Sequence, residues 1–393
     1  MTVEIAASDL AGGNVAGIIQ AAVDRVSAAG GGKVLLPAGT FELRAPISLR
    51  NSVSLRGVVD KTRLRRCRSF STDLARDTDW YESRVTVEDE GIFQTGDGLL
   101  LESEAEHSKF PQVTKHLVTA VNGREIEVNK QPRVNHWVKG AARASLSFSV
   151  IEGNEISHFS VEDLVIDGNG GENPLLDGNH CAGLFFQDCV DFAVRGVTVT
   201  NFNGDGISWQ VCHDVLIENC RVEDCSDLGM HPGSGSQRSV IRHNSISNCK
   251  VGLFWCWGVR HGIAEGNLIT GSREAGISIG HRDTDNVLCG NRVVDSGKVG
   301  ILFRPERSAD HVANRTRIEG NEIVNVGTTS SPGIAICLCR GLREIRISDN
   351  IMRNDNDARL VAIQIPQDVC DIEIIQNKTD APVCDERLHE VSP

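Results

Sequence analysis

The stretch GDGISWQ, residues 204–210, introduces a pattern that returns along the second half of the chain. A glycine is followed by an apolar residue, a variable residue and a second apolar residue. The repeats are GLFF (183–186), GISW (206–209), GMHP (229–232), GLFW (252–255), GISI (276–279), GILF (300–303) and GIAI (333–336). The step is 23 or 24 residues as far as Gly300 and lengthens afterwards. This regularity indicates a repeat protein rather than a series of independent domains.

A second column of residues accompanies the glycines. It consists of Cys220, Asn244, Asn267, Asn291, Asn321, Asn350 and Asn377. Helical spacing is absent from these segments, and so is the leucine-asparagine consensus of leucine-rich repeats. Two short strands per period therefore predict an all-β fold, a right-handed parallel β-helix in which each coil rises by about 4.8 Å. The inward asparagines are expected to bond to one another along the stack.

The chain before the repeats predicts a cap and an insertion. Residues 14–32 carry apolar residues at helical spacing and end in a glycine run, which predicts a helix before the first strands. Residues 60–150 break the rhythm and contain strand-like segments. The predicted organisation is a cap with the first coils over 1–59, an inserted β-rich segment over 60–150, the β-helix coils over 151–380, and a tail over 381–393.

Composition limits the partners of the protein. The 393 residues carry a formal net charge of −13, which argues against nucleic-acid binding. No apolar run reaches the roughly 18 residues of a membrane helix, and no signal-peptide pattern is visible, so a cytoplasmic protein is expected, or a secreted one if a leader has been trimmed. The 13 cysteines include no CxxC pair. We therefore expect reduced core cysteines and no metal site.

Acidic and basic residues fall on one flank of the predicted coils. Strand alternation points the variable position of each repeat outward, and His231 is one of these positions. Asp205 and Asp227 lie near the glycines of two adjacent coils. Lys250 and Glu274 occupy the position of Asp227 on the next two coils. Paired carboxyls are what glycosidic cleavage requires, one as proton donor and one as base or nucleophile. The predicted catalytic residues are therefore Asp205, Asp227, His231, Glu274 and Lys250.

A structural alternative stays open for the same residues. Asp227, Lys250, Glu274 and Lys298 alternate in charge from coil to coil, so they can also form a ladder of surface ion pairs. Further side chains that follow the outward strands are predicted to bind substrate, because aromatic and polar groups suit sugar rings and hydroxyls. These are Arg304, Arg282, His281, Trp257, Gln210 and Glu306.

Two resemblances support this interpretation. The order of a helix, GGG, VLLPAGTF and VSLRG over 14–57 resembles the entry segment of the pectate-lyase-like β-helix superfamily. NGDG (203–206) and CSDLG (225–229) are similar to the Asn-Thr-Asp-Gly and Asp-Asp motifs of the polygalacturonase family. The resemblance implies a catalytic role for Asp205 and a proton-donor role for Asp227. This sequence departs from the family at Leu228, in place of the second aspartate, and at Val251, in place of the catalytic histidine.

The expected function is a carbohydrate-active enzyme that cleaves glycosidic bonds of an oligo- or polysaccharide, a glycoside hydrolase without a cofactor. The first alternative is a polysaccharide lyase or uronate epimerase, which would use Lys, His or Arg and in which Ca²⁺ is a candidate cofactor. The second alternative is a non-catalytic glycan-binding β-helix. The architecture is also compatible with a homotrimer or another homo-oligomer.

Overall fold

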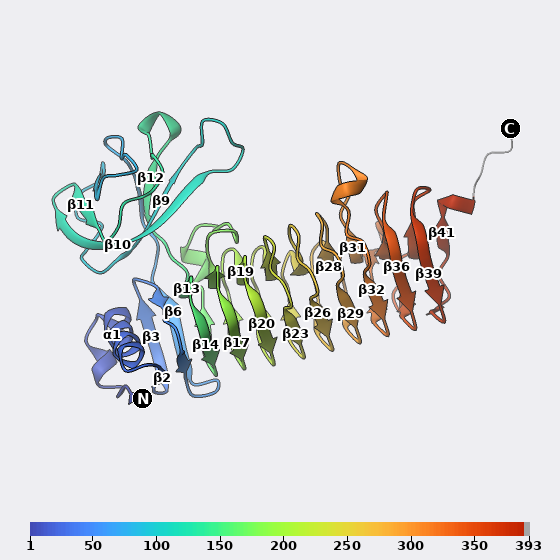
Figure 1. The fold of residues 1–393 in the computed structure, drawn as a ribbon, viewed down its shortest axis with the longest axis horizontal. Helices are drawn as coiled ribbons and strands as arrows, with labels where there is room; N and C mark the ends of the chain where they lie inside the picture. The colour runs from blue at the N-terminus through green and yellow to red at the C-terminus, as the bar shows by residue number, and fades with distance from the viewer. Residues whose placement is uncertain (389–393) are drawn as a thin grey trace.

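Three long parallel sheets run the length of the molecule, because each coil contributes one strand to each sheet (Figure 1). The computed structural model describes residues 1–388. Sheet 1 contains β1 (Thr2–Glu4), β2 (Gly32–Leu35), β5 (Val53–Arg56), β14 (Ser157–Glu162), β17 (Val190–Arg195), β20 (His213–Glu218), β23 (Val240–Arg242), β26 (Ile263–Glu265), β29 (Val287–Cys289), β32 (Arg317–Glu319), β36 (Arg343–Ser348) and β39 (Cys370–Ile375).

The other two sheets follow the same stacking order. Sheet 2 contains β3 (Gly39–Leu43), β6 (Thr62–Arg66), β15 (Val165–Asp167), β18 (Thr198–Thr200), β21 (Arg221–Glu223), β24 (Ser245–Ser247), β27 (Leu268–Thr270), β30 (Arg292–Val294), β33 (Glu322–Val324), β37 (Ile351–Arg353) and β40 (Lys378–Thr379). Sheet 3 contains β4 (Ile47–Ser48), β13 (Ile151–Asn154), β16 (Ala182–Gln187), β19 (Asp205–Gln210), β22 (Leu228–Gly233), β25 (Val251–Phe254), β28 (Ala275–Ile279), β31 (Val299–Phe303), β35 (Ser331–Cys337), β38 (Leu360–Ile365) and β41 (Val383–Asp385). The short β34 (Gly327–Thr328) pairs with β35.

The interior of the coils is apolar. The apolar positions of the GISW-type repeats point inward, and Trp209 and Trp255 are fully buried. The Trp209 indole N–H donates to Ser239 Oγ at 3.0 Å, so its polar group has a partner inside the core. Strand pairing keeps equivalent residues in register, as in Ile207 opposite Met230. The predicted β-helix core is therefore present.

A ladder of buried asparagine amides runs up the solenoid. From Asn244 to Asn350, each side-chain Nδ2 donates to the Oδ1 of the next asparagine at 2.9–3.0 Å, and the ladder ends on Asn377. The backbone N–H of each donor residue is bonded to the same Oδ1. Every buried turn amide thus has a partner, which buried polar groups require.

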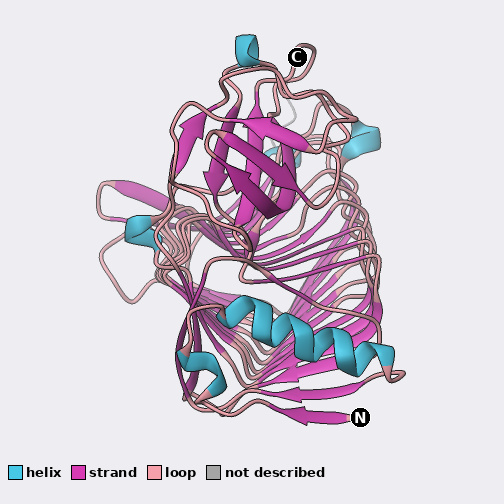
Figure 2. Cartoon of the chain, turned by 90° about the vertical axis from the view of Figure 1, so that its left-hand side faces the viewer, coloured by secondary structure: helices cyan, strands magenta, loops and turns pink. Residues whose placement is uncertain are grey.

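The helix α1 (Val15–Ala28) lies across the first coils and covers the end of the stack, as Figure 2 shows. Asn14 caps it by accepting the Gly17 N–H at 3.1 Å. Its buried face includes Ile19, Val23 and Val26, at the spacing expected for one side of a helix. The sheet edge at this end is therefore shielded, as a parallel solenoid requires.

An antiparallel sheet projects from the first coils, at the upper left of Figure 1. Its strand order is β7 (Ser71–Asp73), β12 (Arg143–Leu146), β9 (Gly98–Ser103), β10 (Gln112–Asn122), β11 (Glu125–Val128) and β8 (Arg84–Thr86). We call it the inserted sheet. Lys115 of this sheet forms an ion pair with Glu152 of the solenoid at 3.4 Å and lies 4.1 Å from the Phe185 ring centroid. The inserted sheet is therefore anchored to the outer side of sheet 3.

Short 3-10 helices complete the chain. They are η1 (Asp9–Ala11), η2 (Val138–Gly140), η3 (Gly170–Glu172), η4 (Ala309–His311) and η5 (Glu386–Leu388). Of the segment assigned to a tail, β41 pairs with β38 and η5 follows it, while residues 389–393 lie outside the described residues. Within residues 1–388, no helix is long and apolar enough to cross a membrane.

Candidate functional site

The two predicted catalytic aspartates lie on neighbouring coils of the same flank. Asp205 opens β19, and Asp227 immediately precedes β22, the next strand of sheet 3. The Asp227 N–H donates to Gly204 O at 3.2 Å, and the Leu228 N–H donates to Asp205 Oδ1 at 3.1 Å. The equal length of the coils thus brings the two aspartates to one place.

Asp205 is sealed beneath the loop 168–181. Its side chain is fully buried. A Cβ atom at Gly178 would lie 1.6 Å from Asp205 Oδ2, so only glycine allows the loop to close over this carboxyl. Ser208 Oγ donates to Gly178 O at 2.6 Å and receives the Gln210 amide at 3.0 Å, which buries Gln210 as well. Both side chains are buried in this structure, whereas Asp205 was expected to act on a substrate and Gln210 to bind one.

His231 completes a buried pair with Asp205. Its Nδ1 lies 2.7 Å from Asp205 Oδ2, and the imidazole is only 2% exposed. The ring meets the edge of Phe254 at a centroid distance of 5.4 Å. His231 Nε2 is buried without a well-aligned hydrogen bond among the described residues. His231 is therefore buried, whereas an outward-facing acid or base was expected.

The proton of this pair resides on His231. Burial lowers the pKa of His231, but the contacts with Asp205 and with the Cys256 thiol outweigh it and raise the pKa to about 9. Burial raises the pKa of Asp205, while the His231 and Leu228 donors oppose this change. Asp205 and His231 therefore compete for a single proton. Since the carboxylate accepts two hydrogen bonds, we assign the negative charge to Asp205 and the positive charge to His231.

Asp227, in contrast, opens into a cleft of about 360 Å³ between the solenoid and the inserted sheet. The carboxyl forms an ion pair with Lys250 Nζ at 3.3 Å and is 31% exposed. The cleft is lined by Leu100, Glu102, Pro111, Val113, Leu175, Leu176, Asp177, His180, Cys181 and Asp227. Apolar walls with a few polar groups are typical of a ligand site. Burial lowers the pKa of His180, which favours its neutral form.

The predicted charge ladder is present as two separate ion pairs. Lys250 pairs with Asp227, and Lys298 Nζ pairs with Glu274 Oε1 at 3.3 Å. The Glu274 pair is largely solvent-exposed and lies two coils from Asp227. Surface pairs of this kind contribute about 0–1 kcal/mol. This arrangement favours a structural role for Glu274, while Lys250 remains beside the cleft.

Arg304 is held by protein groups around Phe254. Its guanidinium lies 4.1 Å from the centre of the Phe254 ring. Its Nη1 donates to Ser278 Oγ at 2.8 Å, and its Nη2 donates to Trp255 O at 2.7 Å and pairs with Asp283 Oδ2 at 3.4 Å. Most of its donors are therefore used inside the protein, which limits the predicted role as a substrate clamp.

The remaining predicted binding residues form a second group beyond Arg304. Trp257 is 57% exposed and stacks on the His281 ring at a centroid distance of 4.8 Å. His281 Nδ1 lies 3.2 Å from Glu306 Oε2. Arg282 is exposed, and its Nε donates to Asp310 O at 3.2 Å. The structure thus divides the predicted site into a cleft around Asp227 and a group around His281.

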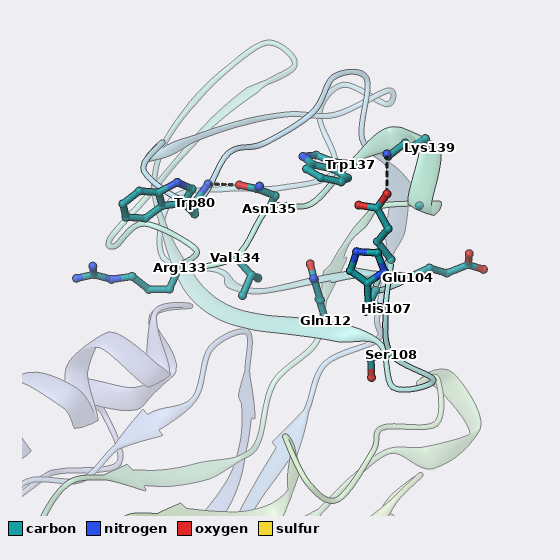
Figure 3. Close-up of a pocket in the computed structure, with 13 residues that line it drawn as sticks. Trp80, Glu104, His107, Ser108, Gln112, Arg133, Val134, Asn135, Trp137 and Lys139 are labelled. Carbon is teal, nitrogen blue, oxygen red and sulfur yellow. Dashed lines mark hydrogen bonds and ion pairs between the residues drawn. The ribbon is translucent and has the colours of Figure 1, made fainter.

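A larger cavity of about 710 Å³ lies in the inserted sheet (Figure 3). Trp80 and Trp137 line it together with Arg133 and Asn135, and the backbone N–H of Trp80 donates to Asn135 Oδ1 at 2.9 Å. Gln112 lines this cavity, whereas its neighbour Val113 faces the Asp227 cleft. Alternation along β10 therefore places the two cavities on opposite faces of the β9–β10 hairpin.

Sequence reasoning missed three cleft residues: Glu102, Asp177 and His180. Asp177 and His180 belong to the loop 168–181, which is far longer than the equivalent connection 201–204 one coil later. That extra length was the available signal, because a long loop beside regular coils marks a place where function concentrates. Glu102 lies in the inserted sheet, and the periodicity of the coils carries no information about it.

Comparison with known proteins establishes the family. The model of the right-handed beta helix region matches residues 182–378. The chain therefore belongs to this family, and its fold is a right-handed parallel β-helix of the pectate-lyase-like kind, as the sequence predicted. No curated protein matches the sequence significantly.

Solved structures share this fold at low sequence identity. The A-module of a mannuronan C-5 epimerase from Azotobacter vinelandii is 12% identical, with a TM-score of 0.58 over 95% of this chain and 93% of its own. An exopolygalacturonase from Thermotoga maritima is 13% identical, with a TM-score of 0.55 over 96% and 92%. A surface adhesin of Streptococcus pneumoniae is 13% identical, with a TM-score of 0.55 over 96% and 90%. At these identities the likeness concerns the fold alone.

Proposed function

We propose that this protein is a carbohydrate-active enzyme that hydrolyses a glycosidic bond in the cleft beside Asp227. The observation that carries the proposal is the meeting of Asp227, Glu102 and Asp177 in one cleft between two structural units. Proteins named as an epimerase and an exopolygalacturonase have the same fold, which agrees with action on a glycan. The volume of about 360 Å³ is at the lower end of the range for small-molecule sites, so the cleft suits a short segment of a sugar chain.

The roles of the carboxyls follow from their surroundings. Asp227 lies 3.3 Å from the Lys250 ammonium at the wall of the cleft, and we assign it as the base or nucleophile. Glu102 comes from the opposite wall, so it is the group that we assign as proton donor to the leaving oxygen. Asp177 Oδ1 accepts the Asn179 N–H and side-chain amide, both at 2.8 Å, so we assign it to substrate hydroxyls rather than to proton transfer.

The lining of the cleft favours hydrolysis of a neutral glycan over the lyase or epimerase alternative. Elimination or epimerisation of a uronate requires a cation to neutralise its carboxylate. The described residues that line the cleft include three carboxyl groups and neither arginine nor lysine, and Lys250 beside the cleft is already paired with Asp227. Among the described lining residues, no cation is therefore free to neutralise the carboxylate of a uronate. Asp205 and His231 act in this proposal as positioning residues, because Asp205 holds the Leu228 N–H next to Asp227.

The test is a panel of neutral and acidic oligosaccharides, with products analysed by mass. We expect cleavage with the gain of one water and a loss of roughly 10²–10⁴-fold in rate for Asp227→Asn and Glu102→Gln. Asp224→Asn is the matched control, since Asp224 lies on the same coil but is exposed on another side, where its carboxyl accepts the Asn248 amide. Full activity in both cleft variants contradicts the proposal. An unsaturated product that absorbs in the near ultraviolet supports the lyase alternative, and binding without turnover supports a binding module.

A further inference from the structure

Two loops on neighbouring coils bring two imidazoles and one carboxylate together. His281 follows β28, whereas Glu306 and His311 follow β31, and His311 ends the short helix η4. One donor atom of each side chain lies within 4.8 Å of the donor atoms of the other two. His281 Nδ1 is 3.2 Å from Glu306 Oε2, and the two histidine rings have centroids 4.6 Å apart. All three side chains are partly buried.

The backbone holds this cluster in place. The Arg282 N–H donates to His311 O at 2.8 Å, which ties the two loops together directly beside the ligand candidates. The Gly258 N–H donates to His281 O at 2.7 Å. Buried Asp283 accepts the Gly258 and Val259 N–H groups at 2.9 Å, which fixes the turn that carries His281. These bonds hold the two loops in place before any ligand binds, which lowers the entropy lost on ligand binding.

Aromatic packing shields one side of the cluster. The Trp257 ring stacks on His281 at an interplanar angle of 29°. His311 packs on the same imidazole at 38°. His281 thus lies between two rings and has little freedom to turn away. A ligand side chain whose orientation is locked by packing gives a well-defined site.

We propose that His281, Glu306 and His311 bind a divalent zinc ion. Two imidazoles and one carboxylate are a known zinc ligand set, and three protein ligands leave a further position for water or a substrate group. Zinc bonds to nitrogen and oxygen are about 2.0–2.2 Å long, so tetrahedral donors lie roughly 3.3 Å apart. The His281–Glu306 distance of 3.2 Å already matches this value. The other donor atoms lie within 4.8 Å of one another, and rotation of Glu306 and His311 toward the fixed His281 closes the remaining gap.

The sequence predicted no metal site, so the proposed zinc ion departs from that prediction. Zinc motifs in sequences place their ligands close together, whereas residues 281 and 306 are one coil apart and meet only through stacking. Calcium, the candidate in the lyase alternative, prefers oxygen ligands and does not suit two imidazoles. The cluster lies two coils from Asp227, so this proposal does not depend on the proposed glycosidase activity.

Isothermal titration of the untagged, chelator-treated protein with Zn²⁺ alone tests the proposal. We expect one equivalent to bind, and we expect His281→Ala, His311→Ala and Glu306→Gln each to weaken binding at least about tenfold. The exposed His261 provides the control, since His261→Ala removes an imidazole from the same side of the solenoid without touching the cluster. Ca²⁺ is the control ion and is expected not to bind.

Crystals grown with zinc give a second readout. An anomalous peak within bonding distance of the three side chains is the expected result. The absence of stoichiometric binding overturns the proposal, and so does equal binding by the double variant His281→Ala/His311→Ala. Zinc held by the exposed Cys370 or Cys384 would survive in that variant and is thereby distinguished. Circular dichroism verifies that the variants are folded.

Discussion

The buried Asp205–His231 pair should make the stability of the protein depend on pH in a predictable direction. The folded-state pKa of His231 is raised to about 9, above its ordinary value of 6.5. A group whose folded pKa is raised stabilises the fold below its unfolded pKa, and this contribution is lost as pH rises through the folded pKa. The stabilisation is therefore complete below about pH 6 and lost toward pH 9 and above.

The expected magnitude follows from the same shift. A difference of about 2.5 pKa units corresponds to roughly 3 kcal/mol, at 1.36 kcal/mol per unit. Between pH 5 and pH 8, integration over the two titrations gives a loss of about 2 kcal/mol. Replacement of His231 by asparagine keeps a donor toward Asp205 and removes the titration. The stability of His231→Asn should therefore lack this part of the pH dependence.

The measurement is guanidinium-induced unfolding of both proteins at several pH values from 5 to 8. The informative quantity is the change of unfolding free energy with pH in the wild type minus the same change in His231→Asn. Other buried groups contribute equally to both proteins and cancel in this difference; Cys220 is an example, since burial raises its pKa to about 12. His158→Asn is a matched control, since His158 lies 2.7 Å from Asp191 but both side chains are about two-thirds exposed. Parallel curves for wild type and His231→Asn would refute the assignment of a charged His231.

Two further substitutions test the solenoid and the loop that covers Asp205. Asn267→Ala removes the partners of Asn244, Ile241 and Asn291 in the amide ladder, and we expect a loss of roughly 3–6 kcal/mol in unfolding free energy. The exposed Asn248→Ala should cost only about 1 kcal/mol, mainly because Asn248 has a left-handed backbone that alanine adopts less readily. Gly178→Ala forces the loop 168–181 away from Asp205, so we expect about 1–3 kcal/mol of destabilisation and a downward shift of the His231 pKa in an NMR titration. Gly171→Ala in the same loop meets no atom within 4 Å and should leave both quantities unchanged; equal effects of the two glycine variants would contradict the close contact at Gly178.

The regular part of the fold was predictable because one short pattern recurs at constant spacing. The glycines from Gly183 to Gly300 are in register in sheet 3, and the asparagine column forms the ladder that its spacing indicated. The prediction was wrong for Gly333, because Gly300 lies opposite Ala335, two residues further on. The same regularity was enough to place Asp205 and Asp227 on one flank, since both follow the coil period. Periodicity therefore predicts where a residue lies around the solenoid.

What covers a residue was not predictable in the same way. Asp205 and Asp227 look alike in sequence, yet the first is sealed by Gly178 and the second opens into the cleft. The difference arises from an irregular loop and from an inserted sheet, whose positions depend on contacts far apart in the chain, such as Lys115 with Glu152. Glu102 entered the site for the same reason, and the repeat pattern carries no information about it. For His180 the one available signal was the extra length of the loop 168–181.

Because every coil adds the same rise, the number of coils between two sites sets their distance along the solenoid axis. The cleft at Asp227 and the cluster at His281 are separated by two strand spacings, roughly 10 Å along the axis. Removal of the coil between them would shorten this distance by one strand spacing, but it would also remove Lys250 and Trp257, which contact the two centres. Gain or loss of whole windings is thus a route by which such proteins can adjust the gap between two centres in discrete steps.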